Sequence, residues 1–358
     1  MAVPPDCVSL PDYERHFARR ADPAVRAYVD GAAADGITQA RNRAVLDALC
    51  LLPRVLRDMR GASAAIDLFG QRLAHPIIAA PTAYHRLVHP EGELASARAC
   101  GLTETPFVAS TLASTPIEAI AAATAGPLWF QLYAQPRWDD TLALARRAEA
   151  AGCTALVLTA DAPVSGIRNM EQRAGFQLPE GVRAVNLPPA PASAPPAAGS
   201  PVFQGMLDAA PTWETVERLC RETPLPVVLK GVLAPDDAAR AIDAGCRGIV
   251  VSNHGGRVLD TVPAAIEMLP EVAARVAGRV PLLVDGGIRR GTDIVKALAL
   301  GATAVMIGRP VLHALAVGGL PGVAHMLTVL KTELEATMAL TGCPRVADID
   351  AGLIRGGR

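Results

Sequence analysis

Residues 248–257 read GIVVSNHGGR, a short apolar run that stops at a polar turn rich in glycine. The apolar residues do not alternate with polar ones, which is typical of a strand buried on both faces of a parallel sheet. The turn places His254 and Arg257 just after the end of that strand. An imidazole transfers protons near neutral pH, and a guanidinium grips a carboxylate with two hydrogen bonds. The stretch therefore predicts a site that binds an acid and moves a proton beside it.

Further apolar runs of the same kind recur along the chain, and amphipathic stretches lie between them. The runs cover residues 77–81, 106–110, 128–132, 155–160, 226–230, 281–285 and 304–308. Helix-like patterns cover, among others, residues 138–151, 235–244 and 292–300. Eight strand–helix repeats in one chain predict a closed (β/α)8 TIM barrel of the α/β class. The alternative is an open, doubly wound sheet.

A polar side chain follows each of these runs, whereas the starts of the runs carry none. The residues are Thr82, Ser110, Gln131 with Tyr133, Thr159 with Asp161, Lys230, Asn253 with His254, Asp285 and Arg309. Active sites of such barrels lie at the C-terminal ends of the strands. We therefore expect these side chains to converge on one site.

Two segments lie outside the repeat. Residues 1–75 are predicted to form an N-terminal helical cap, and residues 76–358 the barrel, within one structural domain. A long mobile loop is expected at 180–210, after the fourth strand, because 188–201 holds six prolines and five alanines and is unable to pack a core. Its position allows a lid or a simple linker equally.

The composition limits the class of protein. Half of the 358 residues are apolar, which is enough for a sizeable core, and the net charge of −1 leaves no basic surface, so no nucleic-acid partner is expected. Seven scattered cysteines without a CxxC pair indicate reduced thiols in a cytoplasmic protein and no metal site. The N-terminus does not resemble a signal peptide, and no run approaches the roughly 18 apolar residues of a membrane helix, so no membrane contact is expected.

A second glycine-rich turn follows the seventh run. Residues 284–292 read VDGGIRRGT, a strand end, a turn and the start of a helix, and Gly308 and Arg309 follow the eighth run. Glycines let backbone N–H groups approach an anion, and a helix N-terminus adds partial positive charge. Loops after strands seven and eight often bind phosphate in this fold. A phosphate site is therefore predicted, the alternative being ordinary turn glycines with solvated arginines.

These motifs together resemble the FMN-dependent α-hydroxy-acid oxidase and dehydrogenase family, which includes glycolate oxidase, lactate oxidase and mandelate dehydrogenase. The resemblance runs from about residue 28 to residue 343. It rests on SNHGGRVLD at 252–260, LKG at 229–231, DGGIRRGTDIVKALALGA at 285–302, IGRP at 307–310 and HPEGELASARA at 89–99.

The resemblance implies roles on the substrate side of the site. His254 is the expected base, and Asp161 pairs with it and stabilises its protonated form. Arg257 and Arg168 are expected to bind the substrate carboxylate. Tyr133 is expected to face the hydroxyl or keto oxygen.

The resemblance also implies a cofactor, FMN, and residues around it. Tyr28 is expected to touch the substrate carboxylate, and Lys230 is expected to lie beside the flavin N1–C2 carbonyl, where its charge stabilises the reduced ring. The remaining expected cofactor contacts are Pro81, Thr82, Ala83, Ser110, Gln131, Thr159, Ser252, Asp285, Gly286, Gly287, Arg289, Gly308 and Arg309.

The implied reaction is oxidation of an L-2-hydroxy acid to the 2-keto acid. Ala83 is the residue type of the oxidases, which favours O2 as acceptor and H2O2 as product, while a dehydrogenase with another acceptor is the alternative. A Schiff-base aldolase or lyase that uses Lys230 and a flavin-binding scaffold without activity are further alternatives. Leu112 and the pair Ala174 and Gly175 depart from the family pattern and leave the acid undecided. The family's tetramers imply a homotetramer.

Overall fold

Eight parallel strands close into a barrel in the computed structural model, which describes residues 2–188, 200, 202–203, 207 and 210–356. The strands pair in chain order, and the last, β11, pairs with the first, β4, at Val305 and Ile77. They are β4 (Ile77–Ala79), β5 (Phe107–Ser110), β6 (Leu128–Leu132), β7 (Leu156–Thr159), β8 (Val227–Val232), β9 (Gly248–Val251), β10 (Leu282–Val284) and β11 (Ala304–Ile307). The predicted TIM barrel is confirmed, and the open sheet is wrong.

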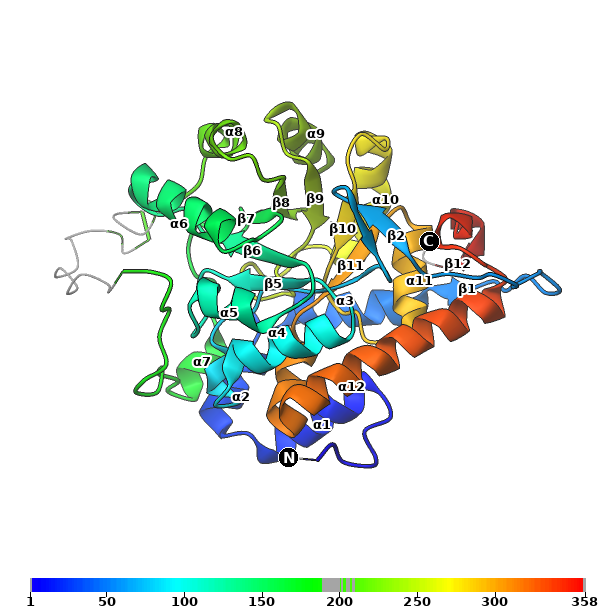
Figure 1. Ribbon diagram of the computed structural model, residues 1–358, viewed down its shortest axis with the longest axis horizontal. Helices are drawn as coiled ribbons and strands as arrows, with labels where there is room; N and C mark the ends of the chain where they lie inside the picture. Colours follow the sequence, from blue (N-terminus) through cyan, green and yellow to red (C-terminus); the bar gives the residue numbers. More distant parts are fainter. Residues whose placement is uncertain (1, 189–199, 201, 204–206, 208–209, 357–358) are drawn as a thin grey trace.

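A helix follows each strand and covers the outside of the barrel (Figure 1). These helices are α4 (Gly92–Leu102), α5 (Ile117–Ala123), α6 (Trp138–Ala150), α8 (Trp213–Glu222), α9 (Pro235–Asp243), α10 (Ala265–Val276), α11 (Gly291–Ala299) and α12 (Arg309–Thr341). In α9, Pro235 occupies the first turn, and Ala238 and Ala241 form a buried face. Small buried residues let the helix backbone lie close to the strands.

The N-terminal cap is helical over only part of its predicted length. Helices α1 (Leu10–Arg20), α2 (Pro23–Asp30) and α3 (Ile37–Ala48) fulfil the prediction. From residue 50 onward the prediction is wrong, because β1 (Cys50–Leu51) pairs with β12 (Ile354–Arg355), and β2 (Ile66–Leu68) pairs with β3 (Gln71–Leu73). Phe69 and Gly70 both have positive φ, as a two-residue hairpin turn requires.

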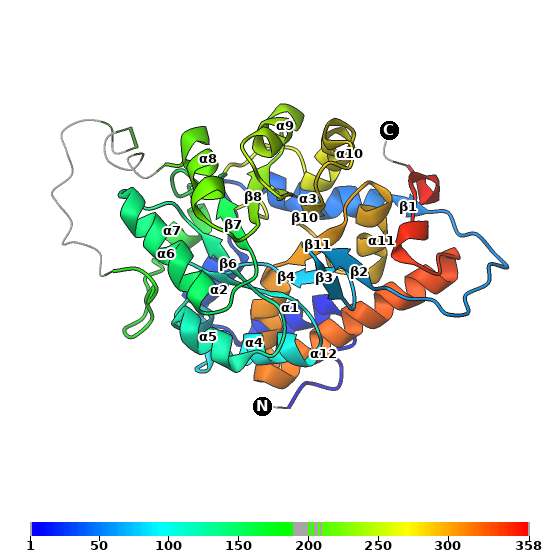
Figure 2. The same cartoon turned by 45° about the horizontal axis from the view of Figure 1, so that its top comes forward.

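The β2–β3 hairpin closes the end of the barrel at which the strands start (Figure 2). Its buried residues Ile66, Leu68 and Leu73 join the cluster that fills the barrel interior. The Phe69 ring lies 5.4 Å from the Trp129 ring, and a Cβ atom at Gly248 would come within 2.8 Å of Phe69. Apolar packing therefore seals this end, which leaves the opposite end for polar chemistry.

By length and composition, helix α12 could cross a membrane. No such helix was expected from the sequence. Its most apolar window is 67% buried, and the helix packs against α1, α4 and α11. The backbone is non-helical at Gly319, with φ 59° and ψ −145°, and Pro321 follows. Core helices of folded domains pass the same test, so α12 is only a weak indication of a membrane span.

The segment between β7 and α8 holds a short helix, α7 (Asn169–Arg173), and the start of the loop predicted to be mobile. That loop, 180–210, lies largely outside the described residues. Its first part is fixed: the Val185 N–H donates to the Ala113 carbonyl, and the buried Asn186 amide bonds Ile117 and Thr115. Three 3-10 helices complete the described elements, at His85–Leu87, Val346–Asp348 and Ala351–Leu353.

Candidate active site

A cavity at the C-terminal ends of the strands brings nearly all predicted site residues together. It is lined by Tyr28, Pro81, Thr82, Ala83, Ser110, Gln131, Tyr133, Thr159, Arg168, Lys230, His254, Arg257, Asp285, Gly286, Gly287, Arg289, Gly308 and Arg309, among others. Asp161 and Ser252 do not line it but hydrogen-bond to residues that do. The one metal-ligand type of cluster in the described chain, Asp6 with Cys7 and His16, shares no residue with this cavity.

His254 is held in a fixed orientation by two neighbours. Its backbone is left-handed, with φ 56°, and its N–H donates to the Ser252 hydroxyl at 3.0 Å. Its Nδ1 lies 2.9 Å from Asp161 Oδ1, which leaves Nε2 for a ligand in the cavity. A positive φ is costly for a residue with a side chain and persists at sites where geometry matters.

Asp161 is the ionised partner of His254. Burial raises the pKa of Asp161, but the charge and hydrogen bond of His254 and the charge of Lys230 outweigh burial, so the pKa lies below its usual value. Gly231 makes room for this carboxylate, because a Cβ atom there would lie 2.4 Å from the Asp161 Cβ. The glycine of the LKG motif thus leaves space for the Asp161 carboxylate that bonds His254.

Lys230 is a buried, paired cation within β8. Its Nζ donates to Ser252 Oγ at 2.9 Å and lies 3.1 Å from Asp285 Oδ2. Burial lowers the pKa of Lys230, but the charges of Asp285 and Asp161 more than compensate, so the net direction is upward. A Schiff-base lysine needs a neutral amine, and this environment therefore argues against the aldolase alternative.

Two arginines, Arg168 and Arg257, line the cavity. Arg257 donates to the carbonyls of Tyr28 and Val29 at the end of α2, and its guanidinium lies 5.6 Å from the centre of the Tyr28 ring. Arg168 is the N-cap residue of α7, and its buried Nε has no hydrogen-bond partner within the described residues. A free buried donor in this place suits a ligand carboxylate, because buried polar groups are otherwise almost always bonded.

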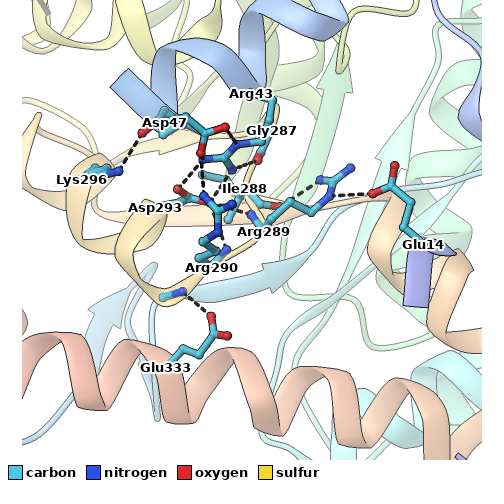
Figure 3. A network of polar contacts seen from close by, with 12 residues as sticks. Glu14, Arg43, Asp47, Gly287, Ile288, Arg289, Arg290, Asp293, Lys296 and Glu333 are labelled. Carbon is cyan, nitrogen blue, oxygen red and sulfur yellow. Dashed lines mark hydrogen bonds and ion pairs between the residues drawn. The ribbon is translucent and has the colours of Figure 1, made fainter. Parts of the chain in front are cut away.

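The far end of the cavity carries excess positive charge. Burial, followed by the charges of Arg289 and Arg257, lowers the pKa of Arg309 to about 9. Burial also lowers the pKa of Arg289, whose guanidinium Nε lies 3.5 Å from the Glu14 carboxylate (Figure 3). Buried cations of like charge destabilise one another unless an anion joins them. A phosphate dianion at this end would supply that charge.

The predicted helix N-terminus after β10 is, however, already occupied. The carboxylate of Asp293 accepts from the N–H groups of Arg289 and Arg290, and Glu333 accepts from Gly291 (Figure 3). The N–H groups of residues 289–291 are therefore not free to bind phosphate, and the phosphate site after β10 and β11 stays a prediction. The N-terminal residue of α12, Arg309, and the Arg289 side chain remain for the anion.

The whole chain, not only the cavity, is similar to known proteins. A family model described as FMN-dependent dehydrogenase matches residues 17–356. The chain belongs to this family. An L-lactate oxidase from Roseobacter sp. (strain GAI101) is 47% identical over 352 residues, which cover 98% of this chain and 95% of that protein.

Two further similar proteins are named as oxidases of 4-hydroxymandelate and of mandelate. A 4-hydroxymandelate oxidase from Amycolatopsis orientalis is 46% identical over 342 residues, covering 95% of this chain and 96% of that one. A solved structure of mandelate oxidase with (S)-2-phenylpropionate aligns with a TM-score of 0.89 at 45% identity, covering 98% of both chains. The cofactor of this family member is FMN.

The residues present fit FMN at both ends. The cationic end formed by Arg289 and Arg309 suits its phosphate, and the Asp285 Oδ1 atom, buried without a partner in the described chain, is an acceptor for a ribityl hydroxyl. A chain of buried hydrogen bonds joins Ser110 to Gln131 at 3.1 Å and Gln131 to Thr159 at 3.0 Å. These side chains are thus fixed before a ring binds over them.

Sequence reasoning missed Glu171, which bonds both Arg168 and Arg257, the two arginines expected to bind the substrate carboxylate. Its Oε1 accepts from Arg168 at 3.1 Å and from Arg257 at 3.4 Å. The four terminal N–H groups of Arg257 donate to Glu171 and to the carbonyls of Tyr28, Val29 and Gly31. A substrate carboxylate therefore has to share these donors with Glu171. The i,i+3 spacing from Arg168 was the only signal in the sequence.

It also missed the contacts by which α3 supports both glycine-rich turns. Asn42 and Asn253 exchange side-chain hydrogen bonds at 3.0 and 2.8 Å. Arg43 donates to the Gly287 carbonyl at 2.7 Å and to Asp293 at 2.6 Å (Figure 3). A Cβ atom at Gly287 would lie 2.6 Å from the Asn42 carbonyl oxygen. This glycine therefore allows the close approach of α3, and not only that of an anion.

A third unpredicted group lies behind the loop after β4. Thr82 Oγ1 and His85 Nε2 are 2.6 Å apart, and His85 Nδ1 lies 2.9 Å from Ser96 Oγ. Burial lowers the pKa of His85, so the ring is neutral and joins Thr82 to Ser96 by hydrogen bonds. His85 thus holds Thr82, an expected cofactor contact, in place.

Proposed function

We propose that this enzyme oxidises L-2-hydroxy acids to 2-keto acids and passes the electrons to O2, which is reduced to H2O2. The observation that carries the proposal is the His254–Asp161 pair, 2.9 Å apart, in a cavity shared with Arg168 and Arg257. This arrangement holds a carboxylate next to a base. Membership of the FMN-dependent family supplies the electron acceptor.

The arginines and tyrosines bind and orient the acid. Arg168 and Arg257 take its carboxylate, with the free Arg168 Nε as the first available donor. Burial raises the pKa of Tyr133, and it raises the pKa of Tyr28 to about 12. Both phenols therefore stay protonated at neutral pH and donate hydrogen bonds to substrate oxygens.

His254 then accepts the proton that leaves the substrate, through Nε2. The Asp161 carboxylate stabilises the imidazolium that forms, and its position on Nδ1 selects the tautomer with a free Nε2. When bound, FMN takes up the two electrons of the oxidation. Lys230 places a positive charge at the cavity floor, where it offsets negative charge that develops next to it.

The proposed acids carry one carboxylate and a small or apolar side chain. Ala83, Leu112 and Leu312 line the cavity and provide an uncharged wall. Relatives are named for L-lactate and for 4-hydroxymandelate, acids with side chains of very different size. Ala83 also supports O2 as acceptor. Homotetrameric assembly and a cytoplasmic location stay predictions; size-exclusion chromatography with light scattering would check the first.

The test is to add a panel of L- and D-2-hydroxy acids to the yellow holoenzyme without air and follow the flavin absorbance. We expect L-acids to bleach it, and readmitted air to restore the colour with one H2O2 per acid oxidised. A bleached enzyme that does not reoxidise in air would identify a dehydrogenase. A protein that no 2-hydroxy acid bleaches, but that borohydride traps on a carbonyl compound at Lys230, would overturn the proposal.

A further inference from the structure

Two of the seven cysteines lie against each other, at the end of the barrel away from the cavity. Cys220 belongs to α8 and Cys246 precedes β9, and their sulfur atoms are 4.0 Å apart. All seven cysteines are in the described part of the chain, and all are free thiols. Cys50 is exposed and serves below as a single-thiol control.

The fold holds this pair together from both sides. Helices α8 and α9 lie side by side on the outside of the barrel in both views (Figures 1 and 2), and the Arg240 guanidinium lies 4.7 Å from the Trp213 ring centre. Gly245 has φ 99°, and a Cβ atom there would lie 3.1 Å from the Cys220 Cβ. The turn before β9 therefore passes directly against Cys220.

The two thiols differ in access and in acidity. Cys220 is half-buried, whereas Cys246 is only 2% exposed. The hydrogen bond from Cys246 lowers the pKa of Cys220, although burial acts in the opposite direction, and the pKa of Cys246 is raised. The thiolate is the reactive form of cysteine. Cys220 is thus the attacking thiol and Cys246 the one that resolves.

We propose that Cys220 and Cys246 form a redox-active dithiol that hydrogen peroxide oxidises to a disulfide. The Cys220 thiolate attacks one peroxide oxygen, the O–O bond breaks, and hydroxide leaves, which gives a sulfenic acid. The Cys246 sulfur then attacks the Cys220 sulfur. The S–S bond forms, and the hydroxyl leaves with the Cys246 proton as water. Two thiols and one H2O2 give one disulfide and two water molecules.

The proposal rests on the proposed function only for the source of the peroxide, which would be the enzyme's own product. The disulfide would join residues 26 positions apart and tie α8 to the turn before β9. Closing such a loop restricts the unfolded chain. We therefore expect oxidation to raise the melting temperature by roughly 3–6 °C. Because the disulfide would lie outside the catalytic cavity, we expect kcat to stay unchanged.

The test treats reduced holoenzyme with a small excess of H2O2, blocks remaining thiols with N-ethylmaleimide, and digests it with trypsin without reductant. We expect the thiol count to fall from seven to five and residues 219–221 to be joined to residues 241–247. Cys246→Ser should instead leave a dimedone-reactive sulfenic acid at Cys220. Cys50→Ser should form the disulfide as the wild type does.

Oxidation of Cys50 ahead of this pair, or a Cys220 that stops at the sulfenic acid while Cys246 is intact, would overturn the proposal. A second arm replaces added peroxide by turnover of a 2-hydroxy acid in air, with and without catalase. If turnover yields no peroxide but added peroxide still forms the disulfide, the proposed function fails and the dithiol stands. If added peroxide forms no disulfide, the dithiol proposal fails, whatever turnover produces.

Discussion

Replacing Arg309 by methionine should stabilise the flavin-free protein and weaken FMN binding at the same time. Burial and the neighbouring charges of Arg289 and Arg257 lower the pKa of Arg309 from 12.5 to about 9. At about 1.36 kcal/mol per pKa unit, this corresponds to roughly 5 kcal/mol of unfavourable free energy in the flavin-free fold. Because Arg309 keeps partial contact with water, we expect the unfavourable free energy to be about 2–3 kcal/mol.

The sign of the pH dependence follows from the lowered pKa. Below about pH 9 Arg309 is charged in both the folded and unfolded chain, and the full penalty applies. As the pH rises through 9, the folded form releases its proton first and the penalty shrinks. The stability advantage of Arg309→Met over wild type should therefore be largest near neutral pH and decrease above pH 9.

Urea unfolding of the flavin-free proteins and FMN fluorescence titration measure the two effects. We expect a gain of about 2 kcal/mol in unfolding free energy and a loss of roughly 10- to 100-fold in FMN affinity, since a charge-assisted hydrogen bond contributes about 1.5–3 kcal/mol. Arg247→Met, at an exposed arginine outside the cavity, should change neither. A flavin-free Arg309→Met protein that is less stable than wild type, with unchanged FMN affinity, would refute the reasoning.

Three further changes separate the parts of the site. Asp161→Asn should slow flavin reduction by about 10²- to 10³-fold while FMN stays bound, because the imidazolium loses its counter-charge; rapid-mixing absorbance measures this, and a wild-type rate would contradict it. Glu171→Gln should lower KM about three- to tenfold, because it frees Arg168 and Arg257. Initial rates measure this, with Glu149→Gln at an exposed residue as the control. A raised KM would mean that Glu171 positions the arginines instead. Trp129→Ala should cost about 3–5 kcal/mol in urea unfolding through the cavity it leaves in the barrel core, whereas a loss of turnover without a loss of stability would contradict the separation of the two barrel ends.

The strands and the cavity could be predicted because both depend on local patterns. Each buried parallel strand is a continuous apolar run, and the polar residue after it lies at the end of the barrel that carries active sites. The hairpin at residues 66–73 escaped prediction because it is short. Its apolar residues are buried only by contact with the folded barrel, which the local sequence does not indicate. Intrinsic preference is weak for elements of this length.

The supporting contacts escaped prediction because they join distant parts of the chain. Asn42 bonds Asn253 across 211 positions, and Arg43 reaches Asp293 across 250. Nothing near either residue in the sequence indicates its partner. The same holds for the α11 N-terminus: its glycine turn has the pattern of an anion site, but Glu333, from α12, already accepts from Gly291.

The most direct test of the central claim compares anaerobic flavin reduction by one L-2-hydroxy acid in the wild type and in His254→Ala. If His254 is the base, the wild type bleaches rapidly, and His254→Ala bleaches at least about 100-fold more slowly while still binding the 2-keto acid. Binding, read from the perturbed flavin spectrum, separates loss of the base from loss of the pocket. Bleaching of His254→Ala at the wild-type rate would contradict the account.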